Sequence, residues 1–100
     1  MKKIIFSLAL VLAASNAHAR DTIVSVGSST VYPFTTIAAE RFAQDTGSRV
    51  IVESTGTGGG IKLFCNGIGV EHPDMTGASR AMKKKEAEKC AANNVTFEEV

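Results

Sequence analysis

The sequence predicts an α/β fold, in which the strands of a parallel-type sheet alternate with helices that cover it. Two observations carry this prediction. Segments rich in β-branched residues alternate with segments whose apolar residues recur at helical spacing. Each strand-like segment also passes into the next helix-like segment through glycine, serine and threonine. Such alternation is typical of parallel sheets, because parallel strands need long crossover connections.

Three segments are predicted to form strands. The first is "TIVSV" at Thr22–Val26, which is β-branched and alternates in polarity, and the second is "RVIVES" at Arg49–Ser54. A short third strand is expected around Met75–Ala78, and "VTFEEV" at Val95–Val100 could begin a fourth. Strands and helices therefore alternate from the start of the first strand onward.

Two helices are predicted between these strands. After Pro33 the apolar residues recur at helical spacing until Gly47, which provides a stop signal. "TGTGGG" at 55–60 is expected to be a loop, and Ile61–Cys65 a short helix that ends near Gly67.

A third, alanine-rich helix is predicted over Arg80–Asn94, with an exposed charged face. Its spacing pairs Lys83 with Glu86 and Lys84 with Glu88 along that face. We therefore interpret this lysine-rich segment as a solvated surface rather than a nucleic-acid-binding patch.

The first 19 residues are predicted to be a secretory signal peptide. Lys2 and Lys3 precede a short apolar run, and Ala17–Ala19 ends it as an A-x-A site, so we expect cleavage before Arg20. The apolar run is shorter than the roughly 20 residues that a transmembrane helix needs. The domain assignment is thus 1–19 for the signal peptide and 20–100 for the exported part.

Charge and cysteine content narrow the possible functions of residues 20–100. Nine of the eleven basic residues remain there against ten acidic ones, so the net charge is close to −1. This argues against a general nucleic-acid or anionic-membrane binder. Export permits a disulfide, so we expect a Cys65–Cys90 bridge, with two unpaired thiols as the alternative.

The three strand-to-helix junctions carry the strongest functional signal. They read "GSSTVYP", "STGTGGGI" and "GASR", and the carboxyl ends of parallel strands are where α/β proteins bind ligands. Helix starts offer unpaired N–H groups and partial positive charge, which suit an oxyanion. Alternatively, each junction is an ordinary helix cap or a flexible loop. The candidate donors are Ser29, Thr30, Thr57 with the N–H groups of Gly58 and Gly59, and the forked guanidinium of Arg80.

Other chemistries find little support in the sequence. "TGTGGGIK" lacks the spacing of a nucleotide-binding P-loop, and the dinucleotide fingerprint is absent. Residues 20–100 hold one histidine, His72, so a histidine-based metal cluster is excluded. A catalytic triad would need His72 and the nearby Asp74, and we interpret His72 as a surface loop residue. No catalytic residue, metal site or cofactor is assigned.

Three motifs together resemble the start of periplasmic phosphate-binding proteins, the substrate-binding components of phosphate ABC transporters. They are "GSSTVYPFTTIAAERFA" (27–43), "ESTGTGGGIKLFC" (53–65) and "PDMTGASRAMK" (73–83), in the family's order and spacing. The resemblance covers essentially all of 20–100. It implies a two-lobed type II periplasmic binding protein that closes on one inorganic phosphate ion and is not an enzyme. Its partner would be an inner-membrane permease, and we expect a monomer in the periplasm.

The resemblance also implies which residues contact phosphate. The first-loop hydroxyl and N–H donors fall on Ser29, Thr30 and Val31, and the second loop falls on Thr57 and Gly58. The third loop often ends in an aspartate that accepts a proton from phosphate and so rejects sulfate. Here that loop ends in Arg80, which cannot accept a proton but suits a dianion.

A two-lobed binding protein is much longer than residues 20–100. The sequence is therefore expected to contain an incomplete first lobe, a partial three-layer unit of a truncated protein. Two other functions remain open at this stage. One is a secreted oxyanion-binding or interaction domain, and the other is a phosphate-ester hydrolase that uses the same anion cradle.

Overall fold

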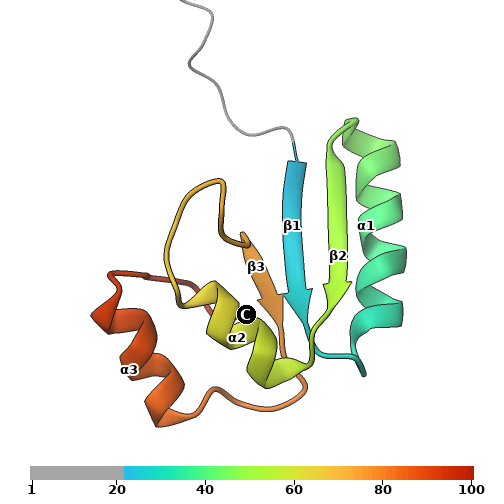
Figure 1. Ribbon diagram of the computed structural model, residues 1–100. Coiled ribbons are helices and arrows are strands. Elements are labelled where there is room, and N and C mark those ends of the chain that lie inside the picture. The colour runs from blue at the N-terminus through green and yellow to red at the C-terminus, as the bar shows by residue number, and fades with distance from the viewer. Residues whose placement is uncertain (1–21) are drawn as a thin grey trace, which may run out of the picture.

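A computed structural model describes residues 22–100, and the predicted signal peptide and its cleavage site lie outside them. Within this range three strands alternate with three helices (Figure 1). Their order and bounds are β1 (Thr22–Gly27), α1 (Tyr32–Thr46), β2 (Arg49–Ser54), α2 (Thr57–Phe64), β3 (Met75–Gly77) and α3 (Lys84–Ala92). Among these residues no helix combines the length and apolar character that crossing a membrane requires.

The three strands form one parallel sheet with β1 in the centre, in the order β2-β1-β3. β1 pairs with β2 along its whole length and with β3 only at its carboxyl end. Gly27 lies opposite Ser54 on one side and Gly77 on the other. All three strands therefore end at one edge of the sheet, which we call the carboxyl edge.

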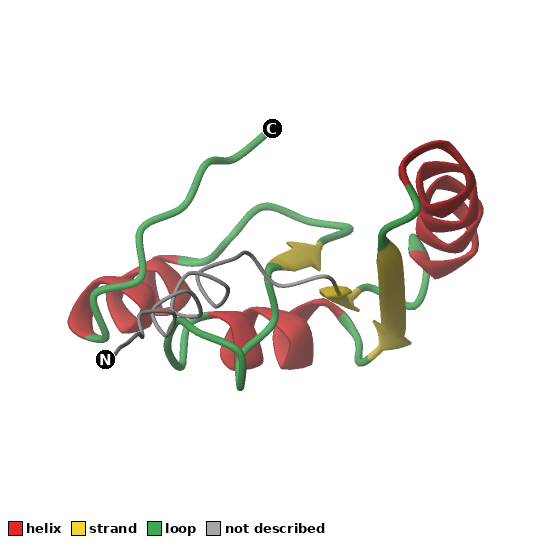
Figure 2. Ribbon diagram, turned by 90° about the horizontal axis from the view of Figure 1, so that it is seen from above, coloured by secondary structure: helices red, strands yellow, loops and turns green. Residues whose placement is uncertain are grey.

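α1 and α2 cover opposite faces of the sheet, and this gives the three layers (Figure 2). α1 packs on β2, whereas α2 packs on β1 and β3 and carries α3 on its outer side. The arrangement follows from right-handed crossovers, because the chain steps one way from β1 to β2 and the other way from β2 to β3. The α/β class and the parallel sheet predicted from the sequence are confirmed.

α2 approaches β1 closely because both have glycine at the point of contact. A Cβ atom added to Gly60 would lie 2.5 Å from the Gly27 Cα and 2.6 Å from the Thr76 hydroxyl. Gly27 itself has φ of +138°. It could not carry a side chain, because a Cβ atom added to Gly27 would lie 2.2 Å from the carbonyl oxygen of Gly77. The glycines thus bring the first turns of α2 down onto the carboxyl edge.

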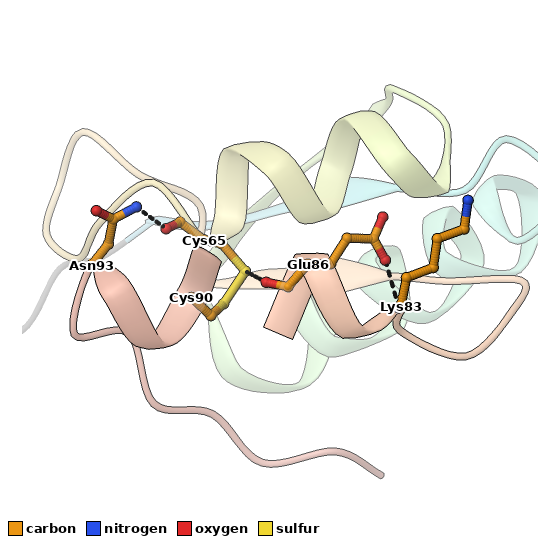
Figure 3. The surroundings of a disulfide bond; sticks show 5 residues. All are labelled: Cys65, Lys83, Glu86, Cys90 and Asn93. Carbon is orange, nitrogen blue, oxygen red and sulfur yellow. Dashed lines mark hydrogen bonds between the residues drawn. A yellow bond between two sulfur atoms is a disulfide. The ribbon is translucent and has the colours of Figure 1, made fainter. Parts of the chain in front are cut away.

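A buried hydrophobic cluster lies between α2 and α3. Ile61 and Cys65 pack against Cys90 and Val95, and all four are nearly inaccessible to solvent. The structure joins Cys65 to Cys90 by a disulfide, which links the end of α2 to α3. The Asn93 side chain donates a 2.8 Å hydrogen bond to the Cys65 carbonyl (Figure 3). α3 is therefore attached to the sheet through α2.

Two helix starts differ from the prediction. α2 begins at Thr57, so Gly58–Gly60 are helical although glycine favoured a loop. The contact between Gly60 and Gly27 explains the glycine at position 60, since a larger residue could not pack there. α3 begins at Lys84 rather than Arg80, because the Glu86 carboxylate accepts the Lys83 N–H at 2.8 Å and caps the helix there.

The segment "VTFEEV" at Val95–Val100 is not a fourth strand. β3 offers only three residues for pairing, and the segment is instead held by Phe97, whose ring meets Phe64 edge to face at 6.0 Å. A hollow of about 490 Å³ separates residues 96–100 from the open edge of β3. The prediction was wrong at this point because the sequence pattern does not show which partner a strand will find.

Candidate functional site

The three strand-to-helix junctions meet at the carboxyl edge and are tied together through their backbones. The Ser28 N–H donates to the Gly77 carbonyl at 2.9 Å, which joins the first junction to the third. The N–H groups of Thr55 and Gly56 both donate to the Gly27 carbonyl, at 3.0 and 2.8 Å, which joins the second junction to the first. The structure therefore brings the three predicted loops to one place (Figure 1).

At the first junction the organising residue is Ser28, which was not among the predicted ligand residues. Its hydroxyl oxygen is buried and accepts the N–H groups of Thr30 and Val31, each at 3.1 Å. The N–H of Val31, predicted to contact a ligand, thus already has an acceptor within the loop. The signal that could have found Ser28 is its position two and three residues before these N–H groups, typical of a capping serine.

Two further hydroxyl groups of this junction face solvent. Ser29 is exposed, and its hydroxyl accepts a 2.9 Å hydrogen bond from the hydroxyl of Ser54, the last residue of β2. Thr30 is also exposed. Ser54 was not predicted, although its position at the end of a strand could have indicated it.

The second and third junctions contact each other directly. The Thr57 hydroxyl lies 3.1 Å from the Ser79 hydroxyl and accepts the Ser79 N–H at 3.1 Å. This pair holds the loop after β3 against the first turn of α2. The predicted residue Thr57 therefore has a structural partner, Ser79, at the same edge.

The start of α2 has no side-chain cap. Gly56 precedes the helix with φ of +84°, and the Gly60 N–H is the first to donate back, to the Gly56 carbonyl. Within residues 22–100 the N–H groups of Thr57, Gly58 and Gly59 have no acceptor. Three backbone donors and the positive end of the helix dipole are thus available at the carboxyl edge.

Arg80 lies beside this helix start. A Cβ atom added to Gly58 would lie 3.5 Å from the Nη2 atom of Arg80, so the guanidinium is a direct neighbour of the first turn. Arg80 donates two hydrogen bonds to the Glu86 carboxylate, at 2.9 and 2.8 Å. The predicted pairing of Glu86 with the Lys83 side chain is replaced by this pairing with Arg80, because Glu86 caps α3 and faces back toward the loop.

The pair shifts the ionisation of both groups. The hydrogen bonds from Arg80 lower the pKa of the Glu86 carboxyl to about 2, and the Lys83 N–H acts in the same direction. The bond to Glu86 raises the pKa of Arg80. Both side chains are therefore charged at neutral pH, as a forked ion pair.

The residues that a hydrolytic triad would need lie elsewhere. His72 and Asp74 precede β3, so they lie at the amino end of a strand whose carboxyl end carries the junctions. Asp74 accepts the Val24 N–H at 2.8 Å and so borders the sheet. Among residues 22–100 no group of three or more histidine, cysteine or acidic side chains could hold a metal ion.

Comparison with known protein families identifies the group to which the chain belongs. A family model described as a PBP superfamily domain matches residues 12–99. The chain belongs to the PBP superfamily. The match includes all three junctions, which in this superfamily member converge on the start of α2.

Known proteins agree with this assignment. Protein SphX of Synechococcus elongatus is 39% identical over 82 residues, covering 81% of this chain and 23% of that protein. Protein SphX of Synechocystis is 39% identical over 89 residues, covering 88% of this chain and 25% of that protein. The crystal structure of a "possible phosphate binding protein" from Planctomyces limnophilus is 43% identical with a TM-score of 0.63, covering 71% of this chain and 24% of that one.

The chain thus spans about a quarter of the length of the relatives that it matches. The resemblance that the three motifs indicate is confirmed, and it extends from sequence to fold. The fold is that of a periplasmic binding protein, with a parallel three-stranded sheet between helices.

Proposed function

We propose that this chain forms the anion-binding part of a substrate-binding protein whose ligand is inorganic phosphate. The observation that carries the proposal is the uncapped start of α2, where three backbone N–H groups beside the guanidinium of Arg80 have no acceptor in the part of the chain that the structure describes. Such an arrangement suits a tetrahedral oxyanion. The likeness to a solved "possible phosphate binding protein" supports phosphate in particular.

Each predicted residue has a role in this proposal. Thr57 and Gly58 supply the hydroxyl and backbone donors of the second junction, and Arg80 supplies charge. Ser29 and Thr30 present hydroxyl groups from the first junction. Val31 contributes by forming the turn around the Ser28 hydroxyl, and its N–H would be shared with the ligand.

The setting of this function is also part of the proposal. Export by the signal peptide over residues 1–19 would place the protein in the periplasm, and the captured phosphate would pass to an ABC-transporter permease in the inner membrane. We expect a monomer that carries no catalytic chemistry. The chain supplies the first part of the first lobe, residues 20–100, and a second lobe would complete the cleft.

Isothermal titration with inorganic phosphate tests the proposal. The protein is expected to bind phosphate, and Thr30→Val with Thr57→Val is expected to weaken binding by about tenfold for each hydroxyl that contacts the ion. Thr36→Val is the matched control, because its hydroxyl bonds the Tyr32 carbonyl on α1. Absence of heat with phosphate, or an equal loss in the control, would contradict the proposal.

A phosphate-ester hydrolase is the alternative from another class. It requires a nucleophile with a nearby base, and His72 lies at the amino end of β3 rather than at the junctions. Turnover of a chromogenic phosphate ester by the purified protein, lost in Thr57→Val, would replace binding with catalysis as the function.

A further inference from the structure

We propose that Glu86 is a positioning residue of the anion site: its carboxylate orients the Arg80 guanidinium beside the first turn of α2 and offsets its charge there. The inference rests on the proposed function, since it concerns the same site. It adds a residue that lies outside the three junctions, on a different helix, and that would set how strongly the site attracts charge.

The first step is the geometry of the pair. Both terminal nitrogens of Arg80 donate to Glu86, at 2.9 and 2.8 Å, and one of them also donates to the Ala81 carbonyl at 3.0 Å. A guanidinium has five N–H donors, so these three bonds fix its plane and leave two for a ligand. Because Arg80 is held at both nitrogens, it cannot turn freely toward solvent. Its place beside Gly58 is therefore fixed from the α3 side.

The second step is how Glu86 itself is held. Its Oε1 atom also accepts the Lys83 N–H at 2.8 Å, which caps α3 (Figure 3). Its carbonyl oxygen lies 3.5 Å from the Cys65 sulfur, next to the disulfide that ties α3 to α2. α2 and α3 are thus connected in two places. One is the disulfide, and the other is the ion pair of Glu86 with Arg80 beside the first turn of α2.

The third step is the charge balance. The first turn of α2 and Arg80 are both positive, and the Glu86 carboxylate is the negative group bonded to that guanidinium. Lys83 also acts on the Glu86 carboxyl, and Lys62, Lys85 and Lys89 line a hollow of about 280 Å³ beside it. Arg80 itself lines the hollow of about 490 Å³ together with Asp74, Glu98 and Glu99, and its guanidinium is hydrogen-bonded and ion-paired to the Glu86 carboxylate. Glu86 therefore keeps the guanidinium from acting as an unbalanced charge. Hydrogen bonds rather than net charge should then dominate anion binding.

The decisive variant is Glu86→Gln. Glutamine can still accept the Lys83 N–H and one hydrogen bond from Arg80, so α3 keeps its cap while the negative charge is removed. The variant is expected to bind inorganic phosphate about fivefold more tightly at low salt, and its affinity should fall more steeply with added salt. A role in folding alone would not change the salt dependence.

Glu88→Gln is the matched control, because Glu88 lies on the same helix and is exposed. It removes the same charge and is expected to change phosphate affinity less than twofold at any salt concentration. Affinity and salt dependence that are unchanged in Glu86→Gln, or altered equally in Glu88→Gln, would overturn the inference.

A second readout works without phosphate. The Glu86 carboxyl, followed by carbon NMR, is expected to titrate near the pKa of about 2 and to move up toward the ordinary glutamate value in Arg80→Gln. An unmoved Glu86 pKa would overturn the inference and leave the proposed function intact. Failure of the unaltered protein to bind phosphate would instead overturn the proposed function. If the unaltered protein fails to bind but Glu86→Gln binds phosphate, that gain still supports this inference. If neither protein binds phosphate, the proposed function and this inference are both overturned.

Discussion

The two faces of the sheet are covered in different ways. On one face α2 and α3 enclose Ile61, Cys65 and Cys90, of which Ile61 is 2% exposed, and a disulfide closes the layer. On the other face α1 buries Ala39, whereas Phe34 and Ile37 remain 71% and 66% exposed. Within the described residues the α2 face is therefore the better packed of the two, and the α1 face presents large apolar side chains to solvent.

This difference matters for the site, because the contacts of its second and third junctions come from the α2 face, whereas the first junction leads into α1. Arg80, Thr57 and the start of α2 depend on the packing of α2 against β1 and on its link to α3. The exposed residues of α1 contribute nothing to that packing. Changes on the α2 face should accordingly affect stability and anion binding together, and changes at the exposed residues Phe34 and Ile37 of α1 should affect neither.

The largest effect is expected from removal of the disulfide. Cys65→Ala with Cys90→Ala opens a crosslink between residues 25 apart, and a loop of this length corresponds to about 3.5 kcal/mol of unfolding free energy. Urea denaturation measures the loss. Reducing agent should destabilise the unaltered protein but not the double variant. Equal urea midpoints of the two proteins without reductant would contradict the view that the disulfide stabilises this face.

A smaller effect is expected where α2 touches β1. Gly60→Ala places a Cβ atom 2.5 Å from the Gly27 Cα, so backbone must move, at a cost of about 2 kcal/mol. Gly59→Ala is the matched control, since its Cβ would lie 3.6 Å from the Thr55 Cβ, an ordinary contact. Alanine is the better helix former, so the control should be neutral or stabilising by up to about 1 kcal/mol. Thermal melts of the two variants would differ in opposite directions from the parent.

The smallest effect is expected on the α1 face. Phe34→Gln should change the free energy of unfolding by no more than about 0.5 kcal/mol, because the ring is already largely in water. Ile61→Ala is the comparison on the other face and should cost about 3 kcal/mol. If denaturation shows a large loss of unfolding free energy for Phe34→Gln, another part of the molecule covers this helix.

The sequence was sufficient for the first two strands and for the convergence of the junctions that follow them. The β-branched runs at Thr22–Val26 and Arg49–Ser54 are strands, and the junctions after them do converge. These features depend on local pattern and on the rule that parallel strands end at the same edge.

Features that depend on distant contacts were not predicted. Gly58–Gly60 were predicted to be a loop, because the low helix propensity of glycine is visible in the sequence. The contact of Gly60 with Gly27 is not visible there. The pairing of Arg80 with Glu86 was missed for the same reason. It joins a loop to a helix that begins four residues later than predicted, so spacing along one helix could not reveal it.

The position of β1 in the middle of the sheet has a consequence for how the chain acquires its structure. Among the described strands the central one comes first in the chain, yet its partner Met75 on β3 lies far along the sequence from Ser25. One edge of β1 therefore stays unpaired until residues 75–77 are available. Pairings of such long sequence separation form slowly, so the first of the described strands is also the one whose edge is exposed longest to unintended partners.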